Sequence, residues 1–177
     1  MMLGMTLATF TLFHVVLSLV GIATGFIVVY GLLAGKRLDA WTAIFLIFTV
    51  LTSATGFLFP FTHLLPSHIV GILSLLVLAV AIVARYARHL EGIWRLTYVV
   101  TAMIALYLNA FVAVVQSFEK VPALKSLAPT QKEPPFLIAQ LVVMAIFILL
   151  TIFAVRRFRL LSVAADATPR STADKVA

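Results

Sequence analysis

Cysteine is absent from the 177 residues of this chain, and charged residues make up only 11% of them. Without cysteine there is no disulfide, no thiolate metal site and no cysteine nucleophile. Soluble domains carry about 25% charged residues, so the polar side chains here are too few to cover a globule in water. The sequence also contains no GxGxxG, GxxxxGK or HExxH motif. Nothing therefore supports a hydrolase or a nucleotide-binding or nucleic-acid-binding protein, and no motif identifies an enzyme.

Hydrophobic residues form 63% of the chain and are gathered in five long blocks. A helix needs about 20 residues to cross the hydrocarbon layer, and an open strand would leave its backbone groups without partners in lipid. The predicted spans are residues 7–33, 41–61, 66–84, 96–118 and 136–155. We therefore expect an all-α integral membrane protein in the lipid bilayer. Residues 1–159 form a bundle of five transmembrane helices with short loops, and residues 160–177 form a disordered tail.

The lysines and arginines are divided unequally between the two ends of the predicted bundle. Ten lie on one side and three on the other, within a net charge of +7. The larger group is Lys36, Arg37, Arg85, Arg88, Arg95, Arg156, Arg157, Arg159, Arg170 and Lys175, and the smaller is Lys120, Lys125 and Lys132. The positive-inside rule then predicts an N-out/C-in orientation in the inner (plasma) membrane. The basic residues are explained by orientation, not by nucleic acid.

A hairpin at residues 52–71 joins the second and third spans and contains two of the four histidines, His63 and His68. One proline lies before its turn and another lies after it. Pro60 disrupts a helix interior, whereas Pro66 suits the first turn of a new helix. This hairpin therefore brings two histidines to the outer side of the predicted bundle.

Polar side chains within the spans are concentrated in the outer half, when depth is counted at about 1.5 Å per helical residue. The predicted polar layer comprises Thr52, Ser53, Thr55, Asn109, Gln116 and Gln140, with His14 and His68 beside it. In the first span His14, Ser18, Gly21 and Gly25 share one face, and the two glycines have the spacing of closely packed membrane helices. No acidic residue lies within a predicted span, which removes the usual relay groups of an ion-coupled transporter.

Three hypotheses follow from this layer. In the first, His14 and His68 are the axial ligands of a b-type haem in membrane electron transfer. In the second, His14, His63 and His68 bind a metal ion, with copper favoured by imidazole and by thioethers near the N-terminus. In the third, the chain is an accessory or assembly subunit that binds a membrane-protein partner or a second copy of itself. Its outer loop, residues 119–135, would then be the docking element.

Overall fold

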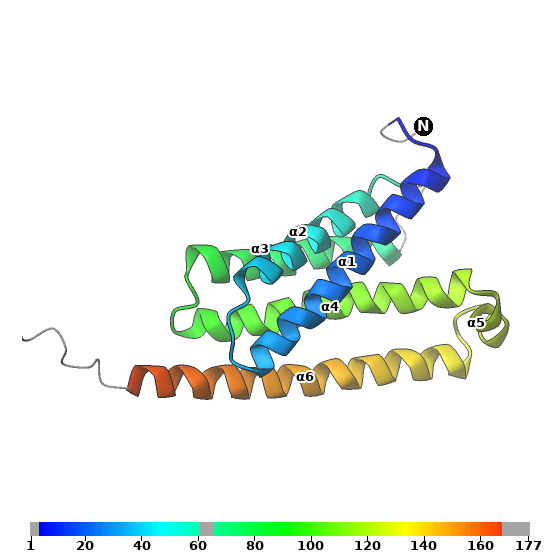
Figure 1. Cartoon of the computed structure of the whole chain (residues 1–177). Helices are drawn as coiled ribbons and strands as arrows, with labels where there is room; N and C mark the ends of the chain where they lie inside the picture. The colour runs from blue at the N-terminus through cyan, green and yellow to red at the C-terminus, as the bar shows by residue number, and fades with distance from the viewer. Residues whose placement is uncertain (1–3, 61–65, 168–177) are drawn as a thin grey trace, which may run out of the picture.

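A computed structural model describes residues 4–60 and 66–167, and these residues form a bundle of helices (Figure 1). Among them, five helices are long and apolar enough to cross a membrane. The all-helical prediction is thus confirmed, and the five apolar helices are consistent with a multi-pass membrane protein. His63 and the turn around it lie outside the described residues.

The helices follow one another with short connections. They are α1 Leu7–Leu33, α2 Asp39–Gly56, α3 Pro66–Ile82, α4 Ile93–Lys120, α5 Pro122–Leu127 and α6 Pro134–Ala167. A five-residue π-helical turn, η1 (Val83–Ala87), continues α3, and the amide of Arg88 donates to the carbonyl of Val83 at 2.9 Å. Three helices begin at proline, whose fixed φ and missing N–H suit a first turn. The short helix α5 lies within the predicted outer loop, residues 119–135.

Helix α4 lies in the middle of the bundle, with α1, α2 and α3 on one side and α6 on the other (Figure 1). Its side chains Tyr98 and Leu106 are almost fully buried, together with Phe45 of α2 and Leu78 of α3. The opposite surface of α6 remains apolar and exposed along most of its length. An apolar surface of this extent is unfavourable in water and suits contact with lipid chains.

Two helix ends differ from the sequence prediction by more than a few residues. Helix α2 ends at Gly56 and not at residue 61, because Pro60 keeps the residue before it out of the helical region. The amides of Phe57 and Leu58 then donate to carbonyls three residues back, and these bonds form the last, tighter turn of the helix. Helix α6 continues to Ala167, beyond the predicted end of the fifth span at residue 155 and into the predicted tail, because its last residues include several good helix formers. Residues 168–177 of the predicted tail lie outside the described part.

Helix α1 approaches its neighbours most closely at two glycines. A Cβ atom at Gly21 would lie 3.1 Å from the hydroxyl of Thr49 and 3.2 Å from the amide nitrogen of Asn109. At Gly25 it would lie 2.4 Å from a methyl carbon of Leu106. Both glycines therefore lie at the contact of α1 with α2 and α4, as their spacing predicts.

One end of the bundle carries most of the cations. The α1–α2 connection, the α3–α4 connection and the C-terminal half of α6 lie at that end, whereas the N-terminus and α5 lie at the other (Figure 1). Arg85 is buried there, forms an ion pair with Asp39, and has its guanidinium 5.1 Å from the ring centre of Tyr98. This residue joins the end of α3 to the beginnings of α2 and α4. We call this the basic end.

The basic end should face the cytoplasm. A reporter that is active only in the cytoplasm should therefore give a signal when fused after Ala177 and none when fused at Ser126. Activity at Ser126 together with silence at Ala177 would reverse the orientation.

Gly25→Leu should lower the melting temperature of the purified protein in detergent. The added side chain would overlap Leu106, and overpacking of this kind costs about 1–3 kcal/mol. Leu19→Ile is the matched control, because Leu19 lies on the same helix and is 57% exposed. A Gly25→Leu variant as stable as the parent would contradict the packing of α1 described here.

Candidate functional site

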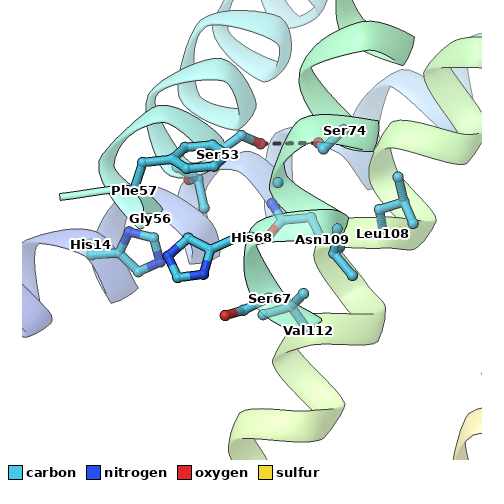
Figure 2. Close-up of a pocket in the computed structure, with 13 residues that line it drawn as sticks. His14, Ser53, Gly56, Phe57, Ser67, His68, Ser74, Leu108, Asn109 and Val112 are labelled. Carbon is cyan, nitrogen blue, oxygen red and sulfur yellow. Dashed lines mark hydrogen bonds between the residues drawn. The ribbon is translucent and has the colours of Figure 1, made fainter. Parts of the chain in front are cut away.

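His14 of α1 and His68 of α3 line one cavity of about 90 Å³, which is also bordered by α2 and α4. Figure 2 shows the two imidazole rings turned toward each other. Polar side chains contribute much of the remaining lining, namely Thr52, Ser53, Ser67, Ser74 and Asn109. The fold thus brings both predicted histidines, from segments more than fifty residues apart, to the same small polar space.

A hydrogen bond fixes the tautomer of His14. Its Nδ1 lies 2.8 Å from the hydroxyl oxygen of Thr55. That hydroxyl lies 2.7 Å from the carbonyl of Leu51, to which it donates its proton, because a carbonyl can only accept. The hydroxyl oxygen therefore accepts from Nδ1–H. In the neutral ring the lone pair is then on Nε2, the nitrogen that remains for a ligand.

His68 is buried, with 4% of its surface exposed, and its ring centre lies 5.7 Å from that of Phe57. Gly71, one turn further along α3, makes room for this phenylalanine, since a Cβ atom there would come within 3.0 Å of the ring. Phe57 therefore fixes the position of α3 beside α2 at the level of the cavity.

Aromatic rings also cover His14. The ring of Phe59 meets it edge to face, with the centres 5.2 Å apart, and Phe10 packs against Phe59 at 5.0 Å. Phe59 lies directly before Pro60, where the chain leaves α2. The early end of α2 thus places an aromatic side chain over the histidine.

Two further hydrogen bonds join the helices around the cavity. The hydroxyl of Ser53 donates to that of Ser74 at 2.9 Å and ties α2 to α3 (Figure 2). The hydroxyl of Ser18 donates to the side-chain oxygen of Asn109 at 2.8 Å and ties α1 to α4. These bonds satisfy polar groups in the interior of the bundle.

Not every residue of the predicted polar layer belongs to this site. Gln116 is exposed and donates to Glu119 at 3.3 Å, near the end of α4. Gln140 is buried between α4 and α6, where it donates to the carbonyl of Phe111 at 3.2 Å and does not line the cavity. Thr55 does not line the cavity and acts on the site through its hydrogen bond to His14. For these two glutamines the predicted depth alone did not identify the neighbouring helix.

Ser67 and Ser74 line the cavity and were not among the predicted residues. A sequence signal existed for both. Ser67 directly precedes His68, and Ser74 follows it by six residues, close to the face of a helix that also holds Gly71. Ser74 follows Gly71 by three residues, so helical spacing from this small residue would have found it.

The size of the cavity can be compared with the proposed cofactors. Pockets for drug-sized ligands measure about 300–1,000 Å³, whereas 90 Å³ corresponds to a few water molecules of about 30 Å³ each. A porphyrin between His14 and His68 would require α1 and α3 to separate, with Phe57 and Phe59 displaced. A single metal ion needs much less room than a porphyrin.

The donor set for a metal ion is small. Within residues 4–60 and 66–167, no group of three or more His, Asp or Glu side chains is arranged to hold a metal. A metal bound by the described residues would use the two imidazoles together with hydroxyl or amide oxygens of the lining. His63, the third predicted ligand, lies outside the described residues.

Comparison with known proteins gives no matching family model, no similar curated protein and no similar solved structure. The functional inference therefore depends on the geometry of the chain itself.

Replacing Asn109 should weaken the bundle. Asn109→Ala removes the acceptor of Ser18, and an interhelical hydrogen bond of this kind is worth about 0.6 kcal/mol on average. We expect a lower melting temperature in detergent for this variant. Gln116→Ala is the control, because it removes an exposed amide from the same helix. Equal effects of the two changes would argue against the Ser18 contact.

Proposed function

We propose that this protein is a multi-pass protein of the inner membrane, oriented N-out/C-in, that binds a small metal ion between His14 and His68, with copper as the preferred metal. The observation that supports it best is the hydrogen bond from His14 to Thr55. Metal-binding histidines usually donate their second ring N–H to a fixed acceptor, which sets the tautomer and the ring orientation. His14 has this arrangement beside a polar cavity shared with a second histidine.

The charge of the cavity favours a monovalent ion. Among the described residues, its lining contains no aspartate or glutamate, so a bound cation keeps its full charge there. Burying a charge without an opposite partner is costly, and the cost is lower for Cu(I) than for a divalent ion. Imidazole is a suitable ligand for copper, and Cu(I) accepts low coordination numbers. The lining hydroxyl and amide groups can orient toward the ion or toward water molecules beside it.

Haem binding remains the alternative for the same two histidines. Unlike copper binding, it requires α1 and α3 to move apart to make room for the macrocycle. A haem held by both rings would give a Soret band and a low-spin b-type spectrum in the purified protein. An absorption spectrum therefore separates the two proposals at once.

An accessory subunit is the second candidate function, and α5 is the observation that favours it. This short helix has no buried residue and lies beyond the ends of α4 and α6 (Figure 1). Val121 and Leu127 expose apolar side chains at its two ends. A membrane-protein partner or a second copy of the chain could cover them. Protein purified without pigment, and without metal after reconstitution, would favour this candidate.

Copper binding can be measured directly. Purified protein is loaded with Cu(I) in the presence of ascorbate, excess metal is removed, and the metal is counted by mass spectrometry. We expect one copper ion per chain in the parent, and loss of binding in His14→Ala and in His68→Ala. His89→Ala is the matched control, because this exposed histidine lies at the basic end. Equal copper in all four proteins, or a Soret band lost in His14→Ala, would overturn the copper proposal.

Thr55→Val tests the tautomer. Valine keeps the shape of the side chain and removes the acceptor, so Nδ1 of His14 loses its partner. Loss of such a supporting contact typically weakens metal binding about 10–100-fold. Competition with a copper chelator should show this decrease for Thr55→Val and none for Thr101→Val, whose hydroxyl bonds only to carbonyls of its own helix. An unchanged affinity in Thr55→Val would argue against His14 as a ligand.

A further inference from the structure

A larger cavity lies at the basic end, between the last turn of α1 and the middle of α6. Its volume is about 310 Å³. Leu33 of α1 lines it together with Leu150, Phe153, Arg156 and Arg157 of α6. It is far from the cavity of His14 and His68, since His14 lies near the beginning of α1 and Leu33 at its end. We call it the α1–α6 groove.

The lining of this groove has two chemically different parts. Leu33, Leu150 and Phe153 provide an apolar wall, and Phe153 is 54% exposed. Arg156 and Arg157 follow Phe153 by about one turn of helix and are both exposed. An apolar wall that ends in two guanidinium groups matches a molecule with a hydrocarbon chain and an anionic head.

The positive charge at the groove is not neutralised nearby by the described part of the chain. Its ion pairs join Arg85 to Asp39 and Lys120 to Glu119, and neither involves the arginines of the groove. Lys36 and Arg37 follow α1 just after Leu33 and add to the positive charge. Guanidinium groups bind phosphate oxygens in a planar, two-point geometry, which makes arginine well suited to a phosphate group.

We propose that the α1–α6 groove binds an anionic phospholipid. The phosphate lies against Arg156 and Arg157, and one acyl chain lies over Leu33, Leu150 and Phe153. Basic pockets between membrane helices near the cytoplasmic surface are suited to anionic head groups. A free phosphate ion would use only the arginines and would leave the apolar wall exposed. The inference is independent of the histidine site, because it involves none of the same residues.

The test measures stabilisation of the purified protein in detergent by added lipid. Phosphatidylglycerol should raise the melting temperature, whereas phosphatidylcholine with the same acyl chains should not, and inorganic phosphate should have no effect at the same concentration. Native mass spectrometry should show bound phosphatidylglycerol surviving on the chain. The double variant Arg156→Gln/Arg157→Gln should lose most of the shift and of the bound lipid.

The matched control is Lys125→Gln/Lys132→Gln, which removes the same charge from the other end of the molecule. It should keep the response of the parent to phosphatidylglycerol. Equal stabilisation by phosphatidylcholine would reduce the groove to an unselective lipid contact and overturn the proposal. A shift reproduced by inorganic phosphate would indicate a simple anion site. An equal loss in both double variants would mean that net charge, and not this groove, attracts the lipid.

Discussion

The close contact of α1 with α2 and α4 determines the arrangement of the half of the bundle that contains the histidine cavity. At Gly21 the backbone of α1 comes so near to its neighbours that a single added carbon would lie 3.2 Å from the amide of Asn109. Because the helices are this close, Ser18, one turn away, can donate directly to Asn109. Two turns away, His14 reaches Thr55 of α2. The small residue Gly21 thus allows polar side chains one and two turns away on α1 to pair with neighbouring helices.

Much of this architecture follows from the sequence, because the length of an apolar block and the position of proline determine where a membrane helix begins and ends. The polar partners were less predictable. Rise per residue gives depth along one helix, but it does not say which helix stands opposite. Gln116 has the phase of Asn109 and yet is exposed, and it bonds to Glu119 of its own helix instead of a neighbouring one. The contact of His14 with Thr55 depends on a pairing of helices that neither segment encodes alone.

The two ends of the bundle contain different kinds of polar group. The end with the histidines contains neutral hydrogen-bonding groups in a space of about 90 Å³. The basic end contains guanidinium groups, one buried against Asp39 and others exposed at the α1–α6 groove. Neutral groups tolerate burial between helices once they are hydrogen-bonded, whereas most charges need water, lipid phosphate or an opposite charge beside them. This difference explains why the cations remain at the ends of the helices.

The π-helical turn at Val83–Ala87 makes the effect of a length change depend on where in the helix it occurs. Such a turn accommodates one residue more than a regular helical turn. Deleting one residue within it would leave a regular turn, and the chain after it would keep about the same direction. Deleting one residue in the regular part of α3, between His68 and this turn, would instead rotate everything after it by about 100° around the helix axis. Arg85 would then turn away from Asp39 and Tyr98. This turn should therefore tolerate a deletion that the rest of α3 would not.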